Sequence, residues 1–93
     1  MIRSFADREA ERIWSGERSR RLPLSIQAVA LRKLRLLQAA VDLGDLRIPP
    51  GNQLEALVDD RRGQHSIRIN KQWRICFRWS DGGCEDVEIC DYH

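Results

Sequence analysis

Arginine side chains recur on one face of a strand-like segment in the second half of the chain. Arg68, Arg74 and Arg78 alternate with apolar residues between Ser66 and Trp79. Successive side chains of a strand point to opposite sides of a sheet, so this spacing predicts that the arginines share one face. The planar guanidinium group binds phosphate oxygens through two hydrogen bonds at once. The pattern therefore indicates a phosphate-binding surface, and a solvated face without a ligand is the alternative.

The other face of the same segment is apolar. A break at 70–72 divides it into two adjoining half-buried strands, whose apolar positions are Ile67, Ile69, Trp73, Ile75, Phe77 and Trp79. Trp73 and Trp79 are most simply core residues on this face. Stacking on a nucleic-acid base is the alternative, and it requires that the rings be exposed. The apolar face must be covered by another element of the chain.

Two helices are predicted before these strands. The first runs from about Ala6 to Ser15, with a capping box formed by Ser4 and Asp7. The second opens near Pro23 and continues to about Val41. Its apolar residues recur at steps of three and four, while Arg32, Lys33 and Arg35 lie mostly outside the stripe: Ile26, Ala30, Leu34, Leu37 and Val41. This second helix is the expected cover for the sheet.

Further strands are predicted on either side of the arginine segment. Residues 54–58 alternate with Leu54, Ala56 and Val58 on one face, and 64–70, 73–79 and 85–90 follow as strands. The loop at 80–83 contains two glycines free to adopt positive φ. Residues 1–5 form either an edge strand or a lead-in. Helices followed by an antiparallel meander predict an α+β fold, with two N-terminal helices packed on a curved, mainly antiparallel sheet. We expect one compact domain spanning residues 1–93.

Composition narrows the class of protein. Sixteen basic residues balance 14 acidic ones for a net charge of +2, and all of the basic residues except Lys33 and Lys71 are arginine. This bias favours recognition of phosphate or carboxylate, or reflects a GC-rich genome. No apolar run approaches the roughly 20 residues of a membrane span, and no secretory signal is present, so we expect a cytoplasmic protein. Three cysteines without paired spacing favour small buried residues over a disulfide framework or a metal site.

Four segments carry a resemblance to a known family. They are residues 45–52 (DLRIPPGN), 63–68 (GQHSIR), 72–77 (QWRICF) and the terminal 91–93 (DYH). On these residues the chain resembles HigB-type toxins of the RelE superfamily over nearly its full length. The resemblance implies a ribosome-dependent endoribonuclease that cuts mRNA in the decoding site. It also implies neutralisation by a cognate HigA-type helix-turn-helix antitoxin, and contact with operator DNA only through the antitoxin complex. We expect no cofactor and no contact with a membrane.

Cleavage of RNA without a metal ion, by attack of the 2′-hydroxyl group, requires three functions. A base takes the hydroxyl proton, cations stabilise the phosphorane, and an acid protonates the leaving 5′-oxygen. We expect Arg68 and Arg74 to provide the cations. Tyr92 and His93 are the candidates for proton transfer, and Asp91 either orients one of them or acts as a base.

Further basic residues are expected to bind RNA. Arg61 and Arg62 lie in a predicted turn at the rim of the sheet, where a solvated turn is the alternative, and Lys71 and Arg78 complete the set. A net charge of +2 is low for a protein that binds RNA unaided, and it suits an enzyme positioned by the ribosome.

The chain departs from some HigB-type relatives, which carry a His and a Lys where this sequence has Glu55 and Val58. Glu55 is therefore a base or a solvated strand acid, and His65 either shares the catalytic role or packs in the core. The departure leaves a second hypothesis open, a non-catalytic module that binds the ribosome or the antitoxin. A third is inhibition of DNA gyrase, which the same fold performs elsewhere in the superfamily.

Overall fold

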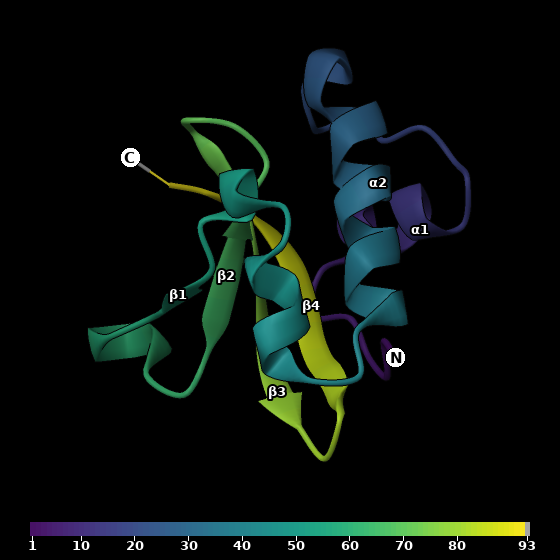
Figure 1. Cartoon of the computed structure of the whole chain (residues 1–93). Coiled ribbons are helices and arrows are strands. Elements are labelled where there is room, and N and C mark those ends of the chain that lie inside the picture. Colours follow the sequence, from purple (N-terminus) through teal and green to yellow (C-terminus); the bar gives the residue numbers. More distant parts are fainter. Residues whose placement is uncertain (93) are drawn as a thin grey trace.

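The computed structural model describes residues 1–92. Two helices come first, α1 (Arg8–Trp14) and α2 (Leu24–Ala39). Three short 3₁₀ turns, η1 (Leu43–Arg47), η2 (Pro50–Asn52) and η3 (Asp59–Arg61), surround the first strand. The strands are β1 (Glu55–Ala56), β2 (His65–Arg68), β3 (Trp73–Ser80) and β4 (Gly83–Asp91). Within the described residues they form one antiparallel sheet in the order β1-β2-β3-β4 (Figure 1). The predicted α+β fold is confirmed.

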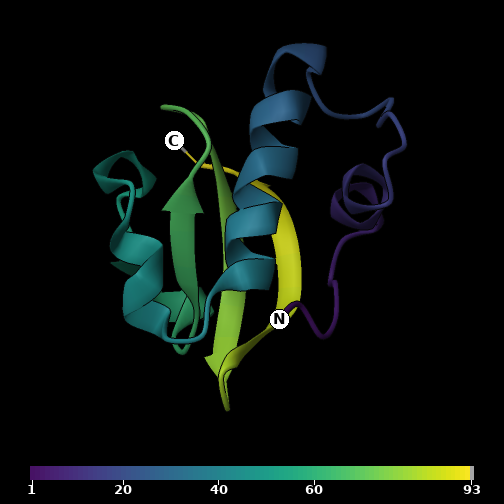
Figure 2. The ribbon, with the colours of Figure 1, turned by 45° about the vertical axis from the view of Figure 1, so that its right-hand side comes forward.

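The strand register separates the two faces of the sheet. Ile67 on β2 lies opposite Ile75 on β3, and Arg68 lies opposite Arg74. Residues directly opposite each other share a face. Both helices lie on one side of the sheet (Figure 2). Ile67, Ile75 and Phe77 are fully buried in the core on that side, as the alternation predicted. The arginine positions therefore lie on the side away from the helices, which we call the outer face.

Helix α2 covers the sheet with the predicted apolar stripe. Four of the five stripe residues are buried in the core: Ile26, Ala30, Leu34 and Leu37. The helix ends at Ala39, so the predicted end at Val41 was wrong, and Val41 is 77% exposed. The Asp45 carboxylate accepts hydrogen bonds from the backbone N–H groups of Asp42 and Val41, which turns the chain out of the helix. The same bonds lower the pKa of Asp45.

Lys33 was expected outside the stripe, and the structure corrects this. The side chain is buried, and Nζ donates a hydrogen bond to the Oδ1 atom of Asn52 in η2. Burial lowers the pKa of Lys33, and the positive charges of Arg32 and Arg68 lower it further. The contact ties α2 to the turn that leads into the sheet.

The first five residues run beside β4 instead of capping a helix. Ile2 and Phe5 form isolated parallel bridges with Cys84 and Val87, so the edge-strand alternative describes this segment better than a lead-in. Because the segment is extended, Ser4 does not cap α1, and the predicted capping box was wrong. Asp7 is the N-cap, and its Oδ1 atom accepts a hydrogen bond from the Glu9 N–H group at 2.9 Å.

Two details of the strand boundaries also differ from prediction. The turn between β3 and β4 uses Asp81 (φ 48°) and Gly82 (φ 75°) as its positive-φ pair, as a tight two-residue hairpin requires. Gly83 belongs to β4 instead. The first strand is shorter than the predicted residues 54–58, because η3 begins at Asp59, with only two residues between it and the end of the strand. Val58 is therefore 71% exposed.

Candidate functional site

A small apolar cluster lies on the outer face. Leu57, Cys76 and Cys90 are buried there, and Tyr92 packs against them. Cys90 lies opposite Arg74 in the β3–β4 register, and Cys76 lies opposite Glu88. The cluster is therefore bordered on the same face by a cation on one side and an acid on the other. Together these residues form the candidate site.

Arg74 is the most tightly held cation of the site. Its Nε atom donates to Ser66 Oγ at 2.7 Å, and Nη2 donates to the Gln53 carbonyl oxygen at 2.6 Å. The Glu55 carboxylate lies 3.8 Å from Nη2. Within residues 1–92, Nη1 forms no hydrogen bond. The guanidinium group is therefore fixed in orientation with one nitrogen left for a ligand.

The burial of Arg74 corrects the expected row of exposed guanidinium groups. The residue is only 7% exposed, and neighbouring Cys76 is fully buried. The segment that contains Gln53 and leads into β1 contacts the guanidinium group through the Gln53 carbonyl oxygen and Glu55, and Ser66 on β2 contacts it through its hydroxyl group. Strand alternation predicted the face on which Arg74 lies but not the loop that covers it.

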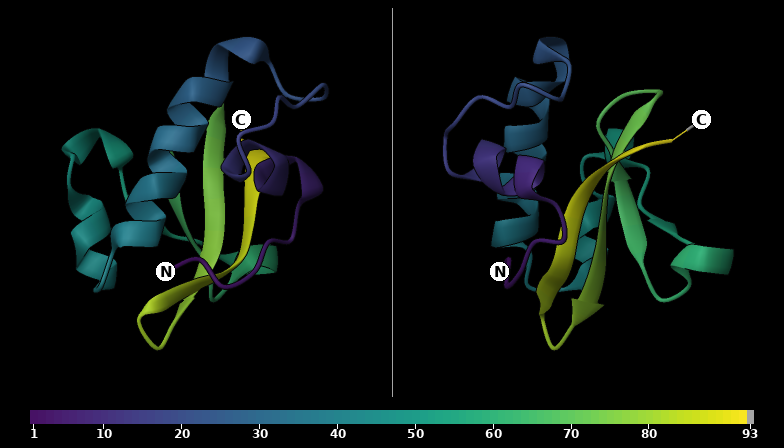
Figure 3. Two further views of the ribbon diagram at one scale, coloured as in Figure 1. Left: turned by 90° about the vertical axis from the view of Figure 1, so that its right-hand side faces the viewer. Right: turned by 180° about the vertical axis from the view of Figure 1, so that it is seen from behind.

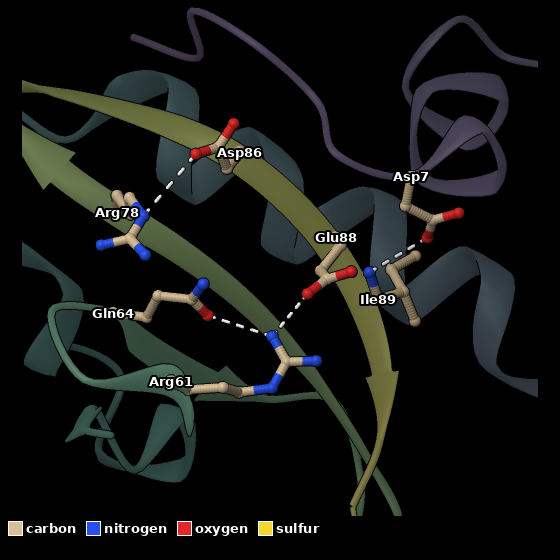
Figure 4. Close-up of polar contacts among 7 residues, drawn as sticks. All are labelled: Asp7, Arg61, Gln64, Arg78, Asp86, Glu88 and Ile89. Carbon is tan, nitrogen blue, oxygen red and sulfur yellow. Dashed lines mark hydrogen bonds and ion pairs between the residues drawn. The ribbon is translucent and has the colours of Figure 1, made fainter. Parts of the chain in front are cut away.

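Arg61 is engaged by the protein and is not a freely projecting cation. Its Nη1 atom pairs with Glu88 Oε1 at 2.5 Å and also donates to Gln64 Oε1 at 3.0 Å (Figure 4). The hydrogen bond to Glu88 raises the pKa of Arg61. Arg61 thus joins the turn before β2 to strand β4 across the outer face.

The other predicted RNA-binding residues lie around this centre. Arg78 is exposed, and its Nε atom lies 3.6 Å from Asp86 Oδ2. Its Nη1 atom lies so close to Gly63 that a β carbon at that position would come within 2.8 Å of it. Arg68 is half-buried opposite Arg74. Arg62 and Lys71 are exposed, and neither forms an ion pair within the described part of the chain. The structure therefore places Arg68 and Arg78 on the same face as Arg74.

Tyr92 is the candidate proton donor that the structure brings to the site. It is half-buried against the outer-face cluster, and burial raises the pKa of its hydroxyl group. The negative charge of Glu55 adds to this increase, whereas Arg61 opposes it. The phenol therefore keeps its proton at neutral pH and is available to donate it.

Asp91 and Tyr92 lie on opposite faces of the sheet. Asp91 lies opposite Trp73, whose side chain packs against the helix-side core. Its carboxylate accepts a hydrogen bond from Gln72 Nε2 at 3.2 Å. The structure therefore does not bring Asp91 together with Arg74. His93 lies outside the described residues.

His65 is half-buried on the helix side of the sheet, opposite Phe77, which favours the packing interpretation over a catalytic one. Its ring stacks on Phe77 with the ring centroids 6.3 Å apart, and Nδ1 is buried without a hydrogen bond. All three cysteines are free and buried, as small residues in strands. Burial raises the pKa of Cys84 to about 11, and donation of the thiol proton to Cys76 raises that of Cys90.

Several residues of the site were not predicted from the sequence. Ser66, Gln53 and Glu88 hold the two arginines. Strand alternation placed Ser66 and Glu88 on the same face as the arginines. That shared face was the sequence signal from which a contact between Ser66 and Arg74 could have been predicted. The Gln53 contribution comes from a backbone carbonyl group, for which the residue type carries no signal.

Residues 1–92 contain neither a cluster of metal-ligating side chains nor a membrane-spanning helix. No three His, Cys, Asp or Glu side chains gather closely enough to hold a metal ion. The helices of this part of the chain are too short or too polar to cross a bilayer.

Comparison with known proteins identifies the family. The family model described as the RelE-like toxin of type II toxin-antitoxin system HigB matches residues 3–93. The chain is 45% identical over 83 residues to Toxin HigB-1 of Vibrio cholerae serotype O1, covering 88% of this chain and 87% of the relative. It is also 35% identical over 74 residues to an uncharacterized protein of Haemophilus influenzae, covering 80% and 73%. The chain therefore belongs to the HigB family of RelE-like toxins, which act in type II toxin-antitoxin systems with an antitoxin as partner.

Proposed function

We propose that this toxin is an endoribonuclease that cuts mRNA on the translating ribosome, in the cytoplasm, by attack of the 2′-hydroxyl group on the adjacent phosphate. The observation that carries the proposal is the Arg74 guanidinium group, held on the outer face by Ser66 and Gln53 beside Tyr92's apolar cluster. Family membership supports it, because RelE-like toxins are generally nucleases of this class.

Arg74 stabilises the developing charge of the phosphorane. Its guanidinium group is oriented before substrate arrives, so little reorganisation is required as charge develops on the non-bridging oxygens. Its Nη1 atom forms no hydrogen bond with the described residues and is available to a phosphate oxygen. Arg68, opposite Arg74 on β2, adds a second positive charge to the same face.

Tyr92 donates its proton to the leaving 5′-oxygen as the bond from phosphorus to that oxygen breaks. The 2′-oxygen forms the new bond to phosphorus, which produces a 2′,3′-cyclic phosphate and a free 5′-hydroxyl group. The Glu55 carboxylate, 3.8 Å from Arg74 Nη2, is the candidate base for the 2′-hydroxyl proton. Asp91 and His93 remain candidates for proton transfer or for orienting the proton donor. A chain truncated before Asp91 tests their contribution.

The remaining basic residues hold RNA without taking part in the reaction. Arg62, Lys71 and Arg78 are exposed around the outer face and suit contacts to phosphates of the message or of ribosomal RNA. The ribosome supplies the geometry that a small protein with a net charge of +2 does not impose alone.

The proposal is tested with purified toxin, ribosomes and a defined mRNA, by mapping the cut sites and the chemistry of the new ends. We expect cuts in translated codons that leave a cyclic phosphate and a 5′-hydroxyl group. Arg74→Ala should abolish them, and Arg35→Ala, on the exposed side of α2, serves as the control. A 5′-phosphate on the downstream fragment would indicate hydrolysis by another mechanism.

The competing function is a toxin that blocks the ribosome without cutting. The burial of Arg74 and the proximity of Glu55, which reduces the net positive charge there, are the observations that favour it. Translation arrest with intact mRNA, equal in wild type and Arg74→Ala, would select this alternative. The HigA-type identity of the antitoxin is likewise a proposal, tested by co-purification of the helix-turn-helix protein encoded beside the toxin.

A further inference from the structure

A hollow lies beside α1, and Glu88 is the residue that it shares with the candidate site. It has a volume of about 790 Å³ and is formed by α1, the connector between α1 and α2, and the last part of β4. Figure 3 shows α1 lying over the end of β4, with the connector looping beyond it. Arg8 and Arg12 line it from α1, and Arg20 and Arg21 line it from the connector. We call this hollow the arginine groove.

The acids in the wall of the arginine groove are already engaged. Asp7 accepts hydrogen bonds from the backbone N–H groups of Glu9 and Ile89, and Figure 4 shows the bond to Ile89. Glu9 accepts from the Ser19 hydroxyl group at 2.6 Å. Glu88 pairs with Arg61, which lies on the outer face.

The four arginines, by contrast, have no side-chain partner in the part of the chain that the structure describes. Within residues 1–92, none of Arg8, Arg12, Arg20 and Arg21 forms an ion pair or a side-chain hydrogen bond. Uncompensated guanidinium groups that converge on one hollow favour an anionic ligand. Arg8 and Arg12 are four residues apart, so they project from the same side of α1.

The connector that carries Arg20 and Arg21 is internally braced. Ser19 is 3% exposed, and its hydroxyl oxygen accepts hydrogen bonds from the N–H groups of Arg21 and Leu22. The Gln27 side chain reaches back from α2 and bonds both the N–H and the C=O group of Ser19 at 3.0 and 2.8 Å. The backbone of the groove therefore needs little ordering when a ligand binds, which lowers the cost of association.

The lining favours an acidic protein segment over a nucleic acid. Ala6 and Leu22 add apolar surface between the arginines, and the carboxylates of Asp7 and Glu9 lie in the same wall. A phosphodiester chain carries a charge at every nucleotide, a regular spacing that a groove of arginines interrupted by carboxylates and apolar surface does not match. A peptide can place separate carboxylates against the arginines and an apolar side chain between them.

We infer that the arginine groove is a docking site for an acidic segment of the antitoxin. The inference rests on membership of the toxin-antitoxin family and not on the proposed nuclease reaction. The segment places Asp or Glu side chains against Arg20 and Arg21 and an apolar side chain against Leu22. The groove lies at the β4 edge beneath α1, so the docked segment contacts a surface distinct from the one that holds Arg74.

The test measures binding of the cognate antitoxin to the full-length toxin directly. Arg20→Glu combined with Arg21→Glu should weaken binding at least about tenfold, mainly through slower association, and should flatten its dependence on salt. Arg32→Glu combined with Arg35→Glu, on the exposed side of α2, is the matched control and should bind as wild type. An equal affinity of groove variant and wild type would overturn the inference.

Growth assays separate this inference from the proposed function. The groove variant should still arrest growth when expressed alone and should escape neutralisation when the antitoxin is co-expressed. Loss of toxicity with unchanged antitoxin affinity would contradict the inference and assign the groove to the ribosome. Arg8→Ala combined with Arg12→Ala is a second variant with the same expected result, and thermal unfolding establishes that each variant is folded. Because binding is measured without RNA, a failure of the nuclease proposal does not affect the outcome.

Discussion

The two faces of the sheet bury their residues in different ways. On the helix side, Ile75 and Phe77 are covered by α2 in a continuous apolar core. On the outer face, the intervening Arg74 and Cys76 are almost equally buried, but their cover consists of short loops, polar partners and a single aromatic ring. Alternating residues of β3 thus lie in two different environments, an apolar core on the helix side and a mixed polar and apolar layer on the outer face.

The difference explains why the candidate site lies where it does. The helix-side core is filled by complementary apolar side chains and leaves no room for a substrate. On the outer face, hydrogen bonds to Ser66 and Gln53 fix the orientation of the Arg74 guanidinium group. Burying a charged group in this way orients it but lowers the free energy of unfolding. If the two faces divide stability and function between them, changes on the helix side should act mainly on folding and changes on the outer face mainly on cleavage.

The largest effect on stability is expected on the helix side. Phe77→Ala removes a fully buried ring that also stacks on His65, and should lower the free energy of unfolding by about 3–5 kcal/mol. Arg78→Ala, one residue along on the exposed outer face, should change it by about 0.5 kcal/mol or less. Urea denaturation measures both. Similar losses in the two variants would mean that the faces do not differ as described.

The largest effect on activity is expected from the outer face. Arg74→Ala should lower the rate of ribosome-dependent cleavage by about 10²–10³-fold, because it removes a pre-oriented donor to the phosphorane. Arg74→Lys should restore little of this rate, since a lysine cannot donate to Ser66, Gln53 and a phosphate from one planar group. Full activity in the lysine variant would show that charge alone is needed and that the frame is dispensable.

A smaller effect on both properties is expected from the support of Arg74. Ser66→Ala leaves the buried Nε atom without its acceptor and should cost about 1.5–3 kcal/mol of stability. Cleavage should fall too, but less than in Arg74→Ala, because the bond to the Gln53 carbonyl oxygen remains. Ser15→Ala, at an exposed position after α1, is the control for loss of a hydroxyl group. Unfolding curves and initial rates on the same preparations give the two numbers.

The smallest effect concerns the pH dependence contributed by Tyr92. Because burial raises the pKa of its hydroxyl group, the folded protein holds the proton to higher pH than the unfolded chain does. Its contribution to stability is therefore complete below the ordinary tyrosine pKa of about 10, and is lost as pH rises through the folded value. Tyr92 is the only tyrosine, so phenolate absorbance reports it directly.

We expect the titration midpoint of Tyr92 to lie higher in the folded protein than in denaturant. Tyr92→Phe should remove this part of the stability loss at alkaline pH. Coincident midpoints would mean that the ring is solvated and does not belong to the outer-face cluster.

Much of the fold was readable from periodicity, and the errors share one cause. The stripe of α2 and the alternation of β3 predicted which residues face each other, and the core containing Leu34 and Phe77 confirms both. The errors concern the helix cap predicted at Ser4, the length of β1 and the exposure of Lys33. Each of these features is set by contacts between segments far apart in sequence. Local pattern carries no information about such contacts.

By itself the sequence determined the α+β class, the side of the sheet on which each arginine lies, and the resemblance that the family comparison later confirmed. These follow from the two-residue repeat of a strand, the helical period and short local motifs. Only the tertiary structure decided that Arg74 is buried and framed, that Arg61 is paired with Glu88, and that Asp91 lies across the sheet from Arg74. Those features depend on where loops cross the sheet and on strand register, which are set when distant segments pack together and exclude water.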